Sequence, residues 1–154
     1  MEHWLGHRNN VPPWNFILDR GIVADTVEIS ATWDRIAAIY DAAVAGLKAI
    51  PGCLAASAHS SHVYRSGLNL YFTFAIQPAD PHEMEPAYFE AWNRILTATA
   101  EGGGSLSHHH GIGRVRRDWL PRELGAEGWS LLRRVKSAID PDRIMNPGVL
   151  LPDA

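Results

Sequence analysis

The stretch LNLYFTFAI (residues 68–76) decides the fold class, because large apolar side chains occupy every second position along it. Side chains two residues apart lie on the same face of a β-strand. The stretch therefore predicts a strand that packs one face into a core and leaves the other face polar. Just before it, the residues RSG (65–67) supply a turn, so residues 54–64 are predicted to be the partner strand of a hairpin.

One further strand and two helices are expected around this hairpin. Residues 22–30 (IVADTVEIS) alternate apolar and polar side chains, with several β-branched residues, which predicts a strand. Apolar residues recur at helical spacing over residues 33–49, with Thr32 as the expected N-cap. A capping aspartate, a proline and a glutamate predict a second helix over residues 81–101, and a short strand near 105–107 follows it.

The element order β-α-β-β-α-β is that of a ferredoxin-like split βαβ domain of the α+β class. We expect an antiparallel sheet of at least four strands, with the helices mainly on one face. Residues 1–154 are predicted to form a single domain. Its parts are an irregular arm (1–20), the ferredoxin-like core (22–108) and a C-terminal helical extension (109–154).

Composition excludes several classes of protein. With 46% hydrophobic and 20% charged residues, the 154-residue chain can bury a core and is not of the disordered class. The formal net charge of −3 argues against a broad nucleic-acid surface. Cys53 is the single cysteine, so no internal disulfide can form. The sequence shows neither a transmembrane segment nor a signal peptide, and a cytoplasmic location is expected.

The most unusual segment is GGGSLSHHHGIG (102–113), in which three histidines stand between glycine clusters. If the run is a strand, His108 and His110 face one side and His109 the other. Such imidazoles can bind a ligand, transfer protons or hold a metal, and the alternative is a polar loop. The arginines that follow, at positions 114, 116 and 117, indicate an anion near the imidazoles or, alternatively, a solvated surface.

A second candidate lies at the end of the first hairpin strand, where His62 and Tyr64 are two residues apart and share a face. A phenol beside an imidazole can donate or accept a proton, although an ordinary polar edge strand explains the pair as well. No metal site is expected, because the histidines show neither zinc-finger spacing nor an HExxH pattern. The sequence also lacks a Walker motif and a GxGxxG motif before a helix.

Four stretches together resemble a known family. They are SATWDRI (30–36), SHVYRSGLNLYFTFAI (61–76), GGGSLSHHHGIGRVRRDWL (102–120) and IDPDRIMNPGVLL (139–151). They resemble the C-terminal cap domain of FAD-linked oxidases of the vanillyl-alcohol oxidase superfamily, and the triple-histidine stretch is most similar to alkyl-dihydroxyacetonephosphate synthases. The resemblance implies FAD as cofactor, bound mainly by a domain missing from this chain. That FAD-binding domain is the implied partner, in cis or in trans.

The resemblance also implies roles for individual residues. Tyr64 would donate or accept a proton at the substrate carbon, and His108, His109 and His110 would line the active site. Arg8 would bind the substrate phosphate, with Arg20 as a fallback, and His62 would contact the substrate. In these synthases a fatty alcohol replaces the acyl chain of acyl-dihydroxyacetone phosphate during ether lipid synthesis. The flavin is a covalent carrier there, and no net redox change results.

Two alternatives stay open. The first is the cap of an FAD-linked D-2-hydroxyacid oxidase or dehydrogenase, a group with metal-binding motifs. Here Leu70 lies where the second histidine of the hairpin motif would fall, and His109 replaces the glutamate of the later motif. The second alternative is a non-catalytic module that binds a partner flavoprotein. Homo-oligomerisation also stays open.

Overall fold

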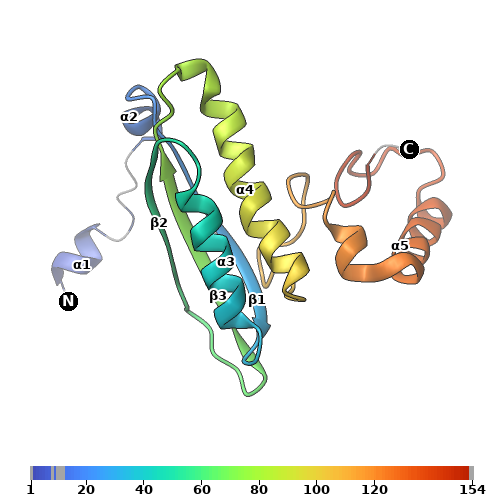
Figure 1. The fold of residues 1–154 in the computed structure, drawn as a ribbon. Coiled ribbons are helices and arrows are strands. Elements are labelled where there is room, and N and C mark those ends of the chain that lie inside the picture. The colour runs from blue at the N-terminus through green and yellow to red at the C-terminus, as the bar shows by residue number, and fades with distance from the viewer. Residues whose placement is uncertain (1, 8, 10–12, 153–154) are drawn as a thin grey trace.

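A three-stranded antiparallel sheet covered by two long helices forms the body of the protein (Figure 1). The structure, a computed structural model, describes residues 2–7, 9 and 13–152. In the described part of the chain, the strands are β1 (Val23–Thr32), β2 (Cys53–His59) and β3 (Gly67–Ile76), in the order β1-β3-β2. The α+β class, the antiparallel pairing and a C-terminal helix are confirmed.

The helices α3 (Ile36–Lys48) and α4 (Met84–Glu101) lie on the same face of the sheet (Figure 1). The apolar side chains of β3 pack against them, and Phe72 and Phe74 are completely buried. Asp80 accepts a hydrogen bond from the backbone N–H of His82 at the start of the short 3-10 helix η1 (Pro81–Glu83), as the sequence predicts. Because both long helices cover the apolar face, the polar face of the sheet stays available for other contacts.

Thr32 is not the N-cap of α3. It pairs with Gly67 as the last residue of β1, and Arg35 occupies the cap position without a capping hydrogen bond from its side chain. Gly67 is required at this pairing, because a Cβ atom there would lie 2.0 Å from the carbonyl oxygen of Ala31. The close approach of the two strands holds the end of the hairpin against β1.

The expectation of a fourth strand is wrong. Near residues 105–107 the chain makes an isolated bridge, in which Ser105 exchanges backbone hydrogen bonds with Ser30. The next N–H, that of Leu106, points away from β1 and donates to the Glu123 carboxylate over 2.8 Å. At the same edge of β1, the carbonyl oxygen of Glu28 accepts a hydrogen bond from Arg116. The Arg116 side chain thus occupies the acceptor on β1 that the next backbone N–H of a fourth strand would need.

The hairpin also differs from its prediction, because β2 ends at His59 rather than near residue 64. The Asn69 side chain accepts hydrogen bonds from the N–H groups of Ser61 and His62, which draws this segment out of the ladder. Pairing resumes at an isolated bridge between Val63 and Leu68, with the register shifted by one residue. The turn over residues 65–67 then closes the hairpin as predicted.

The two ends of the chain contain further helices. The predicted irregular arm holds two short ones, α1 (Glu2–His7) and α2 (Asn15–Leu18). The C-terminal extension, predicted to be helical over residues 109–154, contains α5 (Leu120–Ile139), which is kinked at Gly125, where φ is 68°. Figure 1 shows α5 beyond the end of α4, away from the sheet. None of the helices in the described residues is both long and apolar enough to cross a membrane.

Candidate active site on the polar face of the sheet

A completely buried carboxylate, that of Glu28 in the middle of β1, is the centre of the site. Glu28 pairs with Tyr71 of β3, so its side chain points to the sheet face opposite α3 and α4. Asn69, two residues earlier on β3, donates a hydrogen bond from Nδ2 to Glu28 Oε1 over 2.9 Å. Asn69 therefore joins the carboxylate to the chain segment around His62.

The triple-histidine run is a loop that wraps around this carboxylate. His108 Nδ1 lies 3.0 Å and His109 Nδ1 2.7 Å from Glu28 Oε1. The backbone N–H of His109 donates to Glu28 Oε2 over 3.1 Å. The expected strand alternation is therefore wrong, because His108 and His109 contact the same group. His110 lies apart from them, with Nε2 3.3 Å from the Tyr71 hydroxyl.

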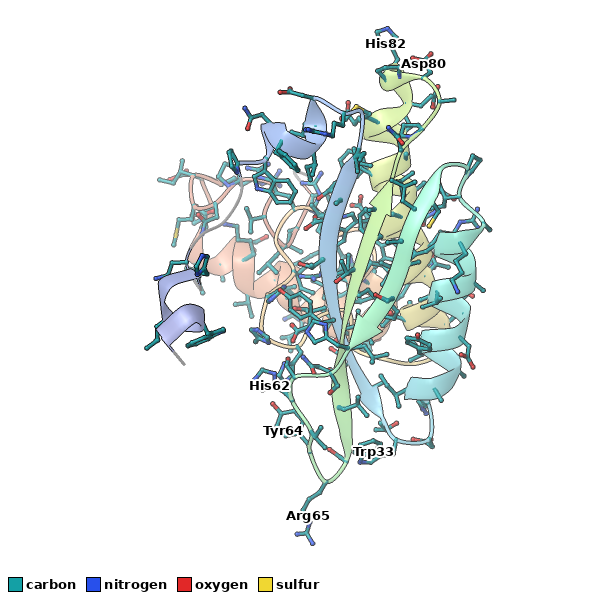
Figure 2. The ribbon with its side chains drawn as sticks, turned by 90° about the vertical axis from the view of Figure 1, so that its left-hand side faces the viewer. Trp33, His62, Tyr64, Arg65, Asp80 and His82 are labelled. Carbon is teal, nitrogen blue, oxygen red and sulfur yellow. The ribbon has the colours of Figure 1, made fainter. Side chains whose placement is uncertain are left out.

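Tyr64 reaches this cluster from the hairpin. Its hydroxyl oxygen lies 2.8 Å from His108 Nε2, although the two residues are 44 positions apart in the sequence. The indole of Trp33 donates a hydrogen bond to the Tyr64 carbonyl oxygen, which ties the hairpin to the end of β1. Figure 2 shows Trp33, His62, Tyr64 and Arg65 together at this end of the sheet. The phenol is about half exposed, at 48%.

His62 completes the cluster. The centre of its ring lies 5.2 Å from that of His108 and 5.4 Å from that of His109. An open cavity of 310 Å³ adjoins the cluster, lined in part by Thr32, Tyr64, Gly103 and His108. A substrate in this cavity would meet a phenol and an imidazole that are already in contact.

Of the two predicted phosphate ligands, Arg20 has a described position, and it is not in this cluster. Arg8 lies outside the described residues. Arg20 stacks on the Phe16 ring near the start of β1, whereas Tyr64 lies beyond the other end of that strand. The arginines after the histidine run bond to backbone carbonyls: Arg116 to Gly111 and Glu28, Arg114 to Pro147, and Arg117 to Gly148. They tie the loop and the C-terminal segment together rather than presenting an anion site.

Four side chains in the described part of the chain could hold a metal ion. One ligand atom from each of Glu28, His62, His108 and His109 lies within 4.8 Å of all the others. Imidazole nitrogens and a carboxylate oxygen suit a divalent transition metal. Leu70, which stands where the second histidine of the metal-binding hairpin motif would fall, belongs to the buried core on the helix face. The neighbouring residue Asn69 faces this cluster instead.

Glu28 has an unusual charge state for a buried acid. Burial alone raises its pKa, but hydrogen bonds from Asn69, from the His109 backbone and from the His108 side chain lower the pKa from 4.5 to about 2. The group is therefore ionised at neutral pH and stabilises the folded chain. The sequence alone does not single it out, because an acidic residue on the polar face of a strand is ordinarily solvated.

This charge state predicts how stability depends on pH. Because the pKa of Glu28 is lower in the folded than in the unfolded chain, its contribution is fully present above about pH 4.5 and is lost as the pH falls towards 2. The loss amounts to about 3 kcal/mol in the free energy of unfolding. Urea unfolding at a series of pH values should show a steep fall for the wild type and a flatter curve for Glu28→Gln. Equal slopes for both would contradict the assignment.

Comparisons with known proteins agree with this architecture. The family described as FAD linked oxidases, C-terminal domain, matches residues 1–150. The FAD-linked oxidoreductase YgcU of Escherichia coli (strain K12) is 35% identical over 143 residues, which cover 88% of this chain and 29% of the relative. Alkyldihydroxyacetonephosphate synthase of Dictyostelium discoideum is 33% identical over 157 residues, covering 97% of this chain and 25% of the relative.

A solved structure of an alkyldihydroxyacetonephosphate synthase superposes with a TM-score of 0.53 at 26% sequence identity. The match covers 86% of this chain and 21% of the synthase chain. The chain thus spans less than a third of the length of the curated relatives named above. With the match over residues 1–150, the chain belongs to the family of FAD-linked oxidase C-terminal domains.

Proposed function

We propose that this chain is the substrate-binding cap of an FAD-dependent enzyme similar to alkyl-dihydroxyacetonephosphate synthase. In that reaction a fatty alcohol replaces the acyl chain of acyl-dihydroxyacetone phosphate. The single observation that carries the proposal is the 2.8 Å contact between the Tyr64 hydroxyl and His108 Nε2. Removing a proton next to a carbonyl requires such an acid/base pair.

Tyr64 is the group that exchanges the proton with the substrate carbon. Its half-exposed phenol lines the open cavity, and His108 behind it can take up or return the phenol proton. His62 and His109 pack beside His108, and His110 lies against Tyr71. We assign these three histidines to the surroundings of the substrate in the complete enzyme, and Arg8 to the substrate phosphate. FAD, held mainly by the FAD-binding domain outside this chain, supplies the covalent-carrier chemistry.

The exposed side of α5 supports a role as one part of a larger flavoenzyme. Leu131, Val135 and Ile139 recur every four residues and so share one side of the helix. They are 61%, 46% and 67% exposed. An apolar stripe of this kind is typical of a surface that another domain covers. We assign the FAD-binding domain as its partner.

The isolated chain is predicted to bind no stoichiometric flavin. The groups that would hold the cofactor lie mainly in the FAD-binding domain, so the 154-residue chain should purify colourless and give little change in flavin fluorescence on titration with FAD. The absorption spectrum of the purified chain checks this directly. Tight binding at one FAD per chain would overturn the cap-domain assignment.

The substrate is tested on the enzyme that contains both this chain and the FAD-binding domain. We expect it to form ether product from acyl-dihydroxyacetone phosphate and hexadecanol, detected by mass spectrometry. A D-2-hydroxy acid such as D-lactate serves as the comparison, with a dye as electron acceptor. Dye reduction by D-lactate without ether formation would contradict the synthase assignment.

The second candidate function is a metal-dependent D-2-hydroxyacid oxidase or dehydrogenase. The cluster of Glu28, His62, His108 and His109 favours it, because these residues can offer four ligand atoms to one ion. On this alternative, a chelator abolishes activity and added Zn²⁺ or Mn²⁺ restores it. The synthase assignment predicts activity that is insensitive to chelators.

A further inference from the structure

Glu28 belongs to no sequence motif that led to the candidate site, yet it contacts His109 and also His108, the histidine next to Tyr64. Its Oε1 atom lies 3.0 Å from His108 Nδ1, and the other nitrogen of the same ring, Nε2, lies 2.8 Å from the Tyr64 hydroxyl. One imidazole therefore bridges a completely buried carboxylate and a half-exposed phenol. This is a continuous chain of hydrogen-bonding groups from a buried carboxylate on the polar face of the sheet to the open cavity.

The carboxylate determines which nitrogen of His108 carries a proton. An ionised carboxylate offers only acceptor oxygens, and a bare Nδ1 lone pair 3.0 Å away would repel it. By this argument the Nδ1 atom of His108 holds a proton and donates it to Glu28. The same holds for His109, whose Nδ1 lies 2.7 Å from the same oxygen and 3.0 Å from His108 Nδ1. In a neutral His108 imidazole this leaves Nε2 as an acceptor, and Nε2 is the atom that faces Tyr64.

The surroundings keep Glu28 ionised and in place. Asn69 donates to Oε1 and the His109 backbone donates to Oε2, so both oxygens have partners that do not titrate. The Arg116 guanidinium donates to the Glu28 carbonyl oxygen at the edge of β1 and adds a positive charge close by. His109 Nδ1, at 2.7 Å, and His62 are the remaining titratable groups near the carboxylate.

We propose that Glu28 is a positioning residue that holds His108 as the Nδ1–H tautomer, so that His108 Nε2 accepts the proton of Tyr64. In this step the O–H bond of Tyr64 breaks, its electron pair stays on the phenolate oxygen, and a new N–H bond forms at Nε2. The proton on Nδ1 does not move, and the carboxylate stabilises the imidazolium that results. The inference rests on the proposed function for its role in catalysis, but the tautomer can be tested without any assay.

The first experiment uses the 154-residue chain labelled with ¹⁵N-histidine. Two-dimensional long-range ¹H–¹⁵N spectra at neutral pH distinguish protonated from bare ring nitrogens, and the signals missing from a His108→Gln variant assign His108. We expect a protonated Nδ1 and a bare Nε2 in the wild type. A bare Nδ1 with a protonated Nε2 overturns the proposal, and this measurement needs no Glu28 variant to fold.

The second experiment compares Glu28→Gln with Glu90→Gln, a matched loss of one carboxylate on α4. In Glu28→Gln the side-chain amide can donate to Nδ1, so the Nε2–H tautomer of His108 should appear, whereas Glu90→Gln should keep the wild-type spectrum. In the enzyme with its FAD-binding domain, Glu28→Gln should lower kcat by roughly 10- to 10²-fold and leave KM nearly unchanged. Unchanged kcat together with the tautomer switch would contradict the positioning role.

Different results would overturn the proposed function and the positioning role of Glu28. If the wild type holds the Nδ1–H tautomer but Tyr64→Phe leaves turnover unchanged, the proposed function is wrong and the tautomer assignment stands. If Tyr64→Phe abolishes turnover but His108 carries its proton on Nε2, the role of Glu28 is wrong and the acid/base assignment of Tyr64 stands.

Discussion

Replacing Tyr64 with Phe is expected to lower the turnover of the complete flavoenzyme by roughly 10²–10⁴-fold, the range for loss of a general acid or base. The substitution removes one oxygen atom, the one that lies 2.8 Å from His108 Nε2 and faces the open cavity. Steady-state kinetics with acyl-dihydroxyacetone phosphate and a fatty alcohol measure the effect. The loss should be in kcat, because the ring that lines the pocket remains.

The fold should be unaffected by this change. The turn around Tyr64 is held by its backbone N–H, which donates to the Gly67 carbonyl, and by Trp33, which donates to the Tyr64 carbonyl. Tyr40→Phe is a matched control, because Tyr40 lies on α3 on the other side of the sheet and stacks on Phe72. If Tyr64→Phe and Tyr40→Phe have the same small effect on kcat, Tyr64 has no role in proton transfer.

Replacing Phe72 with Ala is expected to lower the free energy of unfolding by about 3–5 kcal/mol. Phe72 is completely buried in the middle of the central strand, between Val27 of β1 and Ala58 of β2. Truncation leaves a cavity under α3 that rigid neighbouring strands cannot close. Urea unfolding of the 154-residue chain, monitored by tryptophan fluorescence, measures the change.

The control for this prediction lies next to Phe72 in the sequence. Thr73 points to the opposite face of β3 and is exposed, so Thr73→Ala should change stability by less than about 0.5 kcal/mol. A loss below about 1 kcal/mol for Phe72→Ala would mean that the core is not centred on β3.

The elements that follow from local periodicity could be predicted from the sequence. The alternation over residues 68–76 and the apolar stripe over 33–49 depend on side chains within a few residues of one another. The absence of a fourth strand could not be predicted from local periodicity, because it depends on a hydrogen bond that the edge of β1 accepts from a residue far along the chain. The Glu28 carbonyl at the edge of β1 accepts a hydrogen bond from Arg116, 88 positions along the chain.

For the candidate site too, the sequence alone could identify some residues and not others. Tyr64 and the histidine run could be identified because they stand in recognisable segments, and the structure brings Tyr64 together with His108. Glu28 could not be identified in this way, because its neighbours in the sequence do not distinguish a functional carboxylate from a solvated one on the polar face of a strand. Its burial arises only when the loop of His108 and His109 folds over β1, 80 residues later.

The central claim is that Tyr64 and His108 act as one proton-transfer unit, and a double-mutant cycle on kcat tests it most directly. The four enzymes are the wild type, Tyr64→Phe, His108→Gln and the double variant, each with its FAD-binding domain. Groups that act as a unit show strongly non-additive effects, so the double variant should be about as slow as the slower single variant. If the two losses multiply instead, Tyr64 and His108 act independently and the claim is wrong.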